Sequence, residues 1–238
     1  ELMEGVAKLA EKVKSPVWLH NSETRLEVEE CKKRWGMTPT QLTDSLGMYA
    51  YGGGGYHCVW MDEKDFEIFR DRKLTAVTNP ASNLKLASGI CPVKRFVTDG
   101  ISMAIGTDGP ASNNCLDMFR EMFLTSTLAK VREMDAACVG ADEILYMATA
   151  GGAQAMQLLD CDRLETGKKA DLVMIDLEQP NMQPENNIVK NLVYSGSKQN
   201  VKMTMVNGKI LYEDNQFQIG FDKKEIYRHA NEIIGRMK

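Results

Sequence analysis

Hydrophobic and polar positions in the first two-thirds of the chain alternate between short apolar runs and longer amphipathic stretches. The apolar runs predict buried strands over residues 16–20, 56–60, 74–78 and 101–107. The amphipathic stretches predict helices over residues 1–14, 23–35, 63–72, 113–133 and 141–157. Strands that are separated by helices indicate right-handed βαβ units around a parallel sheet.

The pattern changes after residue 157. Strands are predicted over residues 170–175 and 201–206, and Asn207-Gly208 is a strong hairpin signal between the second of these and the apolar residues that follow. An amphipathic helix is predicted over about residues 222–237. We therefore expect two domains, a barrel-like part over residues 1–157 and a β-domain segment with a terminal helix over residues 158–238.

Composition and charge narrow the class of protein. The 238 residues are 43% hydrophobic and 26% charged, which is typical of a globular chain. A net charge of -4 argues against a nucleic-acid partner, because binding to phosphates needs clustered Lys and Arg. We expect no membrane span, since no apolar run reaches about 18 residues. The six cysteines include no CxxC pair and favour free thiols in a reducing cytoplasm.

Polar side chains stand where three of the predicted strands end. His20 and Glu23 follow the first strand, His57 lies in the second, and Asp108 follows the fourth. The carboxyl ends of strands build the active sites of βα folds, so these residues could converge there. Two imidazoles and a carboxylate suit a divalent metal that activates water. A single strand histidine is more often a packing residue, and we expect His229, on the final helix, to face solvent.

Five stretches of sequence carry a more specific signal. They are HNSETRLEVEE at 20–30, HCVW at 57–60, NPASNLKL at 79–86, GTDGPASNN at 106–114 and GKKADLV at 167–173. In order and spacing they resemble motifs of the amidohydrolase superfamily, in its group of deaminases and chlorohydrolases. Within that group they look like the motifs of deaminases of 5-methylthioadenosine and S-adenosylhomocysteine.

The resemblance implies a role for each of five residues. His20 and Asp108 would ligate the catalytic metal, which is usually zinc, with iron as the alternative. Glu23 would sit beside the purine ring and shuttle a proton, and His57 would hydrogen-bond the attacking water. Asp108 would also accept a proton, and Ser112 would contact the distal part of the substrate. The implied reaction is hydrolytic deamination of a small purine nucleoside, with release of ammonia.

The chain also departs from the family pattern. The family's HxH pair, which supplies two further metal ligands, does not occur in the sequence, and Thr78 stands where the family often has a histidine. The family's N-terminal β segment has no counterpart in this sequence either. A complete (β/α)8 barrel takes about 250 residues, and the four predicted strands match the family's strands five to eight.

These departures set the expected fold class. It is α/β, the C-terminal half of a (β/α)8 TIM-type barrel plus part of a small β-sandwich domain. We expect the C-terminal portion of a longer enzyme, whether truncated, proteolysed or completed by a separate piece. The zinc site would be incomplete, and the chain alone would have little or no activity.

Four consecutive glycines, Gly52–Gly55, run into His57. A GxxxxGK[ST] phosphate loop is ruled out, because Tyr56-His57 takes the place of Lys-Ser. We interpret the run as a close turn that feeds the strand at 56–60, at a place where side chains would clash with neighbouring backbone.

Two alternatives stay open at the level of sequence. The first is another amidohydrolase, such as a guanine deaminase or a triazine hydrolase. The second is a non-catalytic half-barrel assembly module, which the missing ligands favour and the motif spacing of His20, Glu23, His57 and Asp108 opposes. A half barrel leaves two sheet edges that promote association, so we expect a homo-oligomer.

Overall fold

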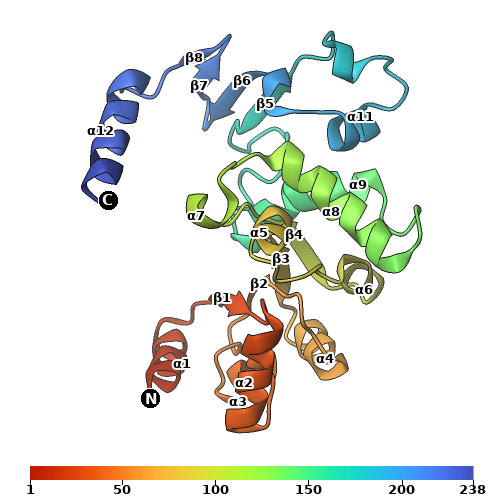
Figure 1. Cartoon of the computed structure of the whole chain (residues 1–238), viewed down its shortest axis with the longest axis vertical. Helices are drawn as coiled ribbons and strands as arrows, with labels where there is room; N and C mark the ends of the chain where they lie inside the picture. Colours follow the sequence, from red (N-terminus) through yellow and green to blue (C-terminus); the bar gives the residue numbers. More distant parts are fainter. Residues whose placement is uncertain (238) are drawn as a thin grey trace.

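The computed structural model describes residues 1–237 and has a mixed α/β architecture. A parallel sheet with its helices occupies the N-terminal part, and an antiparallel sheet lies at the opposite end of the molecule (Figure 1). In the described part of the chain, no helix is both long and apolar enough to cross a membrane.

The parallel sheet has the strand order β1-β2-β3-β4. Its strands are β1 (Val17–Asn21), β2 (Gly53–His57), β3 (Thr75–Thr78) and β4 (Ser102–Ile105). Every neighbouring pair is parallel, as predicted from the alternation of strands and helices. The carboxyl ends of all four strands therefore meet at one edge of the sheet.

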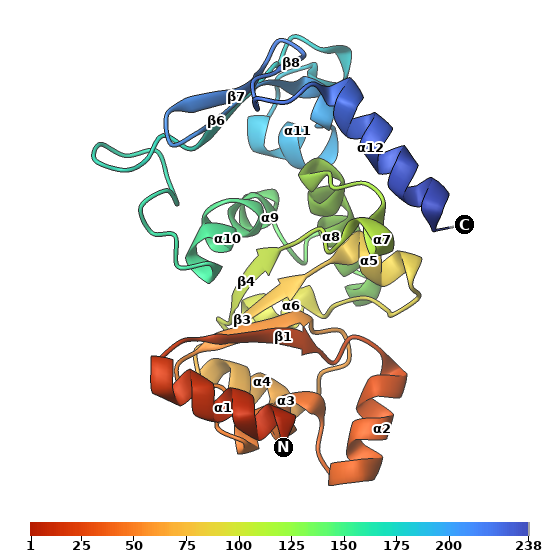
Figure 2. The same ribbon diagram turned by 90° about the vertical axis from the view of Figure 1, so that its left-hand side faces the viewer.

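Helices precede, connect and follow these strands. They are α1 (Leu2–Val13), α2 (Arg25–Trp35), α3 (Pro39–Ser45), α4 (Glu63–Asp71), α5 (Pro80–Lys85), α6 (Val93–Thr98), α7 (Pro110–Asn113), α8 (Met118–Glu133), α9 (Ala141–Ala148) and α10 (Ala150–Ala155). Capping boxes at Thr24 and Asp62 fix where α2 and α4 begin. Figure 2 shows α1 along β1, and α9 and α10 beside β4.

Two of the helices predicted from the sequence are wrong in extent. The helix expected over 113–133 is divided, because Asn114 adopts a left-handed conformation that ends α7 and the Asp117 side chain caps α8. The helix expected over 141–157 breaks at Thr149, whose backbone is not helical (φ -124°, ψ -98°). The break lets Gly151 approach β4, where a Cβ would come within 2.8 Å of the carbonyl oxygen of Met103.

Three of the four glycines form strand and not a turn. Gly53, Gly54 and Gly55 belong to β2, which ends at His57, so the strand expected over 56–60 is wrong in its bounds. Gly54 pairs with β1 on one side and β3 on the other. A Cβ on Gly54 would overlap the carbonyl oxygen of Thr75. The neighbouring backbone is therefore as close to the glycines as expected, but the close contact lies within the sheet and not at a turn.

One main hydrophobic cluster holds the helices to the sheet. Its fully buried members include Tyr49 before β2, Phe69 on α4, Leu74 before β3, Phe96 on α6, Ile144 on α9 and Val193 on α11 (Ile188–Tyr194). Burial of each such side chain contributes about 1.5–3 kcal/mol. The cluster therefore holds the strands and their ends rigidly in place. Through Val193, α11 in the C-terminal third of the chain also belongs to it.

The second sheet is antiparallel, with the order β5-β6-β7-β8. Its strands are β5 (Leu172–Ile175), β6 (Val201–Val206), β7 (Lys209–Glu213) and β8 (Gln216–Phe217), and short 3-10 turns cover Pro180–Met182 and Lys198–Asn200. Asn207 and Gly208 both have positive φ, as a type I′ hairpin turn requires, which confirms the predicted hairpin.

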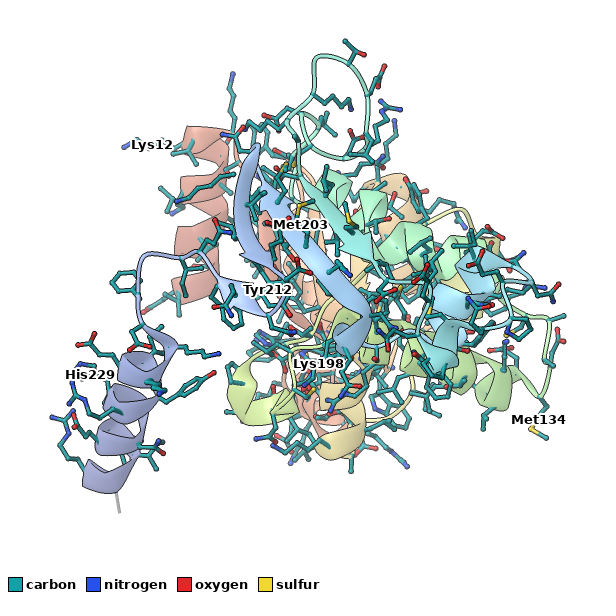
Figure 3. The ribbon with its side chains drawn as sticks, turned by 90° about the horizontal axis from the view of Figure 1, so that it is seen from above. Lys12, Met134, Lys198, Met203, Tyr212 and His229 are labelled. Atoms are coloured by element: carbon teal, nitrogen blue, oxygen red, sulfur yellow. The ribbon has the colours of Figure 1, made fainter. Side chains whose placement is uncertain are left out.

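The last helix, α12 (Lys223–Arg236), is set apart from the rest of the chain. It has no buried residue, and Figures 1 and 3 show it standing away from both sheets. His229 on this helix is exposed, as expected.

Candidate metal centre

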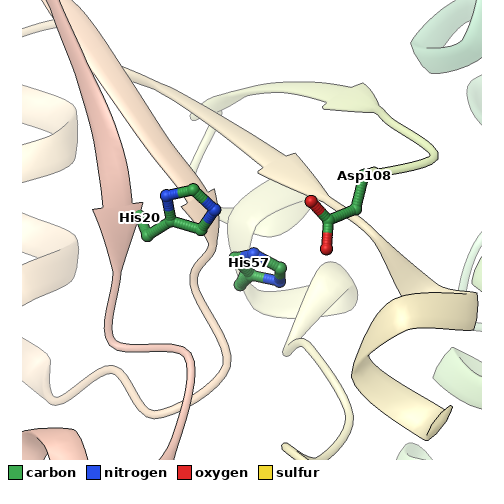
Figure 4. A group of neighbouring side chains, drawn as sticks. All are labelled: His20, His57 and Asp108. Carbon is green, nitrogen blue, oxygen red and sulfur yellow. The ribbon is translucent and has the colours of Figure 1, made fainter. Parts of the chain in front are cut away.

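Three side chains from different strand ends meet at the carboxyl edge of the parallel sheet. His20 comes from β1, His57 from the end of β2, and Asp108 from the loop after β4. One potential ligand atom from each lies within 4.8 Å of the other two. Figure 4 shows the three side chains pointing toward one another. The rings of His20 and His57 are stacked, with centroids 5.2 Å apart.

The backbone at this edge is held in uncommon conformations. His57, Cys58 and Asp108 have φ values of 72°, 48° and 59°, in the left-handed region that non-glycine residues rarely adopt. Each such residue costs of order 1–3 kcal/mol and persists only where its surroundings fix it. Here the amide of Cys58 donates to the carbonyl of Asn21, at 3.1 Å, across the end of β1. Such conformations are concentrated at binding and catalytic sites.

The carboxylate of Asp108 is held by two hydroxyls. Ser82 and Ser112 each donate to Oδ2 at 2.6 Å. Burial alone would raise the pKa of Asp108, but the hydrogen bonds from Ser112, Ser82 and the Gly109 amide, together with nearby His57, bring that pKa below its ordinary value. Asp108 is therefore kept as an oriented anion, which is the form that ligates a cation.

His57 presents an unused nitrogen to the same space. Its Nδ1 lies 2.7 Å from Oδ1 of Asn83, and its side chain is 1% exposed. Its Nε2 is buried without a hydrogen-bond partner among the described residues. A buried polar atom without a partner is costly and uncommon, so an outside group is needed to satisfy it. Two imidazoles and a carboxylate are ligands that zinc accepts, and the centre fits such an ion.

Glu23 lies beside this centre. Its Oε2 is 3.9 Å from Nε2 of His57, and its Oε1 accepts a 2.8 Å hydrogen bond from Ser88. The carbonyl of Ser88 in turn accepts from the indole nitrogen of Trp60 at 2.7 Å. The structure thus brings all four residues predicted for the chemistry (His20, Glu23, His57 and Asp108) to one place.

Comparison with known proteins assigns the chain to a family. The model of the amidohydrolase family matches residues 1–211, which is most of the sequence. The chain belongs to the amidohydrolase family. It is 39% identical over 235 residues to the 5-methylthioadenosine/S-adenosylhomocysteine deaminase of Dictyoglomus thermophilum, covering 98% of this chain and 55% of that protein. It is 42% identical over 217 residues to the enzyme of the same name from Pyrococcus furiosus, covering 91% and 52%.

A solved structure agrees with this assignment. The zinc-bound adenosine deaminase from Xanthomonas campestris is 34% identical, with a TM-score of 0.92 over 98% of this chain and 53% of that one. This amidohydrolase chain therefore spans about half the length of the curated relatives it matches.

Ser112 also has partners within the protein. Its predicted contact with the distal part of a substrate stays a prediction, and in this amidohydrolase its hydroxyl donates to Asp108 and to the carbonyl of Gly109. Ser112 lies on α7, directly beside the centre, and it holds a candidate ligand in position.

Several residues at the site escaped the sequence analysis. Ser82, Asn83 and Ser88 contact the candidate chemical groups, and the first two lie in the quoted NPASNLKL stretch, which was given no role. Glu121 on α8 is fully buried and accepts from the amide of Ala81 at 3.0 Å and from Asn113 at 2.8 Å. It ties α5 to α7, and burial raises the pKa of its carboxyl group. The motif could have pointed to Ser82 and Asn83, whereas Ser88 and Glu121 lie outside every quoted stretch.

Proposed function

We propose that this amidohydrolase chain is part of a metal-dependent hydrolytic deaminase that acts on adenosine-type nucleosides, with 5-methylthioadenosine and S-adenosylhomocysteine as substrates. The observation that carries the proposal is the convergence of His20, His57 and Asp108 within 4.8 Å. The names of the relatives at 39% and 42% identity support the substrate class. The zinc-bound relative from Xanthomonas campestris supports a metal.

The metal of this proposal is zinc, with iron as the alternative, and His20 and Asp108 are its ligands. When bound, zinc supplies a Lewis acid that makes water a nucleophile near neutral pH. The sequence has no HxH pair, so the chain would supply an incomplete ligand set. The further ligands would then come from a segment outside these 238 residues.

The chain's own side chains would manage protons and orientation. His57 would accept a hydrogen bond from the attacking water, and Asp108 would take its proton. Glu23 would carry a proton to the ring nitrogen of the purine. Ser82 and Ser112 would hold Asp108 in position, and Ser112 would also border the distal end of the substrate. A C–O bond forms at the ring carbon, the C–N bond to the exocyclic amine breaks, and ammonia leaves. General acid–base steps of this kind typically contribute about 10²–10⁴-fold.

We also propose that the parallel sheet is the second half of a (β/α)8 barrel, with β1 to β4 as its strands five to eight. Residues 158–238 would then contribute part of a β-sandwich domain. In the part of the chain described, β1 and β4 are each paired on one side. Such open edges promote association, so we propose a homo-oligomer. The free thiols favour a reducing compartment such as the cytoplasm.

Zinc binding by the purified chain tests the centre. We expect the chain to bind zinc in equilibrium dialysis, and we expect His20→Ala and Asp108→Ala to abolish that binding. His229→Ala, which changes an exposed histidine on α12, is the matched control and should bind as the wild type does. Zinc binding that survives both His20→Ala and Asp108→Ala would contradict the proposed ligands.

Activity tests the reaction. The 238-residue chain alone should release little or no ammonia from 5-methylthioadenosine, because its ligand set is incomplete. The longest gene product that contains the chain should deaminate 5-methylthioadenosine or S-adenosylhomocysteine. Release of ammonia from guanine, or of chloride from atrazine, would instead favour another amidohydrolase. A longer product that neither binds zinc nor turns over any of these compounds would favour the non-catalytic assembly module.

A further inference from the structure

We propose that Asn83 is a positioning residue that keeps the ring proton of His57 on Nδ1. Nε2 of His57 then presents its lone pair to the space shared with His20 and Asp108. The inference deepens the proposed function, on which its catalytic meaning rests, whereas the proton position is a property of the chain alone.

The contact between the two side chains fixes which nitrogen carries the proton. Oδ1 of Asn83 lies 2.7 Å from Nδ1 of His57, and both residues are 1% exposed. An amide oxygen can only accept a hydrogen bond, so Nδ1 must donate. A neutral imidazole has one ring proton, and Nε2 is therefore the acceptor.

Asn83 is itself held from both sides. Its amide donates to the carbonyl of Asn79 at 2.9 Å, and its carbonyl accepts from the amide of Ser88 at 2.8 Å. These bonds anchor α5 and the residues that follow it. The side-chain amide nitrogen of Asn83 has no partner among the described residues, so no other hydrogen bond turns the amide group the opposite way. With the amide turned the other way, Asn83 would donate and the proton would move to Nε2.

The surroundings of Nε2 explain why its lone pair matters. The nearest carboxylate oxygen, Oε2 of Glu23, is 3.9 Å away, which is too far for a hydrogen bond. The rings of His20 and His57 stack, so His20 covers one face of the imidazole. Nε2 is left to accept from a water or to meet a cation, and a proton on Nε2 would block both. Asn83 thus sets His57 to accept a hydrogen bond from water.

The position of the proton can be observed directly by NMR. The chain has three histidines, so long-range ¹H–¹⁵N spectra of the ring nitrogens are easily assigned, with His57→Gln to identify the His57 signals. At a pH of about 8.5, well above the ordinary histidine pKa of about 6.5, His57 in the metal-free chain should show a protonated Nδ1 and an unprotonated Nε2. A proton on Nε2 of His57 in the wild-type chain would overturn the inference.

Two variants separate positioning from packing. Asn83→Asp places a carboxylate, which also only accepts, and should keep the wild-type pattern. Asn83→Ala removes the acceptor and should move the His57 proton toward Nε2, while the exposed His229 keeps its shifts. An unchanged His57 pattern in Asn83→Ala would also overturn the inference. If Asn83→Ala does not fold, the wild-type and Asn83→Asp spectra still decide it.

Zinc affinity gives a second readout. Mutation of groups that orient the side chains around a metal typically costs about 10–100-fold in metal affinity or activity, and His57 shares the space of the proposed ligands His20 and Asp108. We therefore expect zinc to bind Asn83→Ala about 10–100-fold more weakly than the wild-type chain, and Asn83→Asp to stay near wild type. Equal zinc affinity in all three proteins would refute a role at the metal centre. Because the spectra are recorded without metal or substrate, failure of the tautomer result leaves the deaminase proposal standing, and absence of deamination leaves the tautomer result intact.

Discussion

At the scale of single residues, the candidate centre depends on neutral side chains that hold charged or ionisable ones. Ser82 donates to Asp108, Ser88 to Glu23, and Asn83 contacts His57. Each of these partners lies on or after α5, the helix that leaves β3. One short segment therefore orients three groups that come from three other strand ends.

Removal of one hydroxyl tests this arrangement. Ser82→Ala takes away a 2.6 Å hydrogen bond to Oδ2 of Asp108. We expect zinc affinity to fall by about 10-fold or more, because the carboxylate loses an orienting donor. Ser195→Ala, at an exposed position far along the chain, serves as the control and should bind zinc like the wild type. Unchanged affinity in Ser82→Ala would mean that Ser112 alone is enough.

Thiol reactivity provides a second residue-level prediction. Burial raises the pKa of the Cys91 thiol to about 12 and also raises that of Cys58. A raised pKa keeps the thiol protonated until higher pH, so at pH 8 both should alkylate with iodoacetamide far more slowly than Cys115, which is partly exposed. Mass spectrometry after timed labelling measures the rates, with the unfolded chain as reference. Labelling of Cys91 as fast as Cys115 in the folded chain would contradict the described burial.

The sequence allowed part of the site to be predicted. His20, His57 and Asp108 could be expected together because parallel strands end at one edge of a sheet. The contacts of Ser82, Asn83 and Ser88 could not be predicted, because the partner of a hydroxyl or amide group depends on how the loop backbone places it. Ser112 illustrates the difficulty, since its position was expected and its contact to Asp108 was not.

At the scale of elements, the glycines of β2 leave no room for a side chain. Gly54→Ala would place a Cβ against the carbonyl oxygen of Thr75 and near the ring of Trp18. We expect the unfolding free energy to fall by about 1–3 kcal/mol, as in other overpacked sites. Urea denaturation followed by circular dichroism measures the change.

A matched glycine exists on α1. A Cβ on Gly5 would meet nothing within 4 Å, and Gly5 lies inside a helix. Gly5→Ala should therefore stabilise the chain by about 0.5–1 kcal/mol. Equal stability of the two variants would argue against close backbone approach at β2.

Helix starts and turns could be predicted where residues close together in the sequence determine them. The capping boxes at Thr24 and Asp62 and the hairpin at Asn207-Gly208 are local signals, and the structure has all three. The glycine strand was misread because glycine disfavours strands and here is required by contacts with two other strands. The break at Thr149 similarly depends on β4, which lies far away in the sequence.

At the scale of the whole molecule, the two terminal helices differ in how much they support the fold. Helix α12 buries no residue, whereas α1 contributes Ala10 to a small cluster with Val17 and Met48. We expect deletion from residue 222 onward to leave the thermal midpoint nearly unchanged. Deletion of residues 1–13 should lower it by several degrees, because each 1 kcal/mol lost shifts the midpoint by about 2–4 °C in a chain of this size. Calorimetry of both deletions measures the difference, and a large loss on removing α12 would contradict its exposed position.

Trp60 joins its indole to the carbonyl of Ser88, and the hydroxyl of the same serine holds Glu23. Trp60 is also 41% exposed, so its surroundings change whenever that segment shifts. The protein thus carries a natural fluorophore at the rim of its centre. Its emission would let ligand entry be followed in real time, without any attached dye.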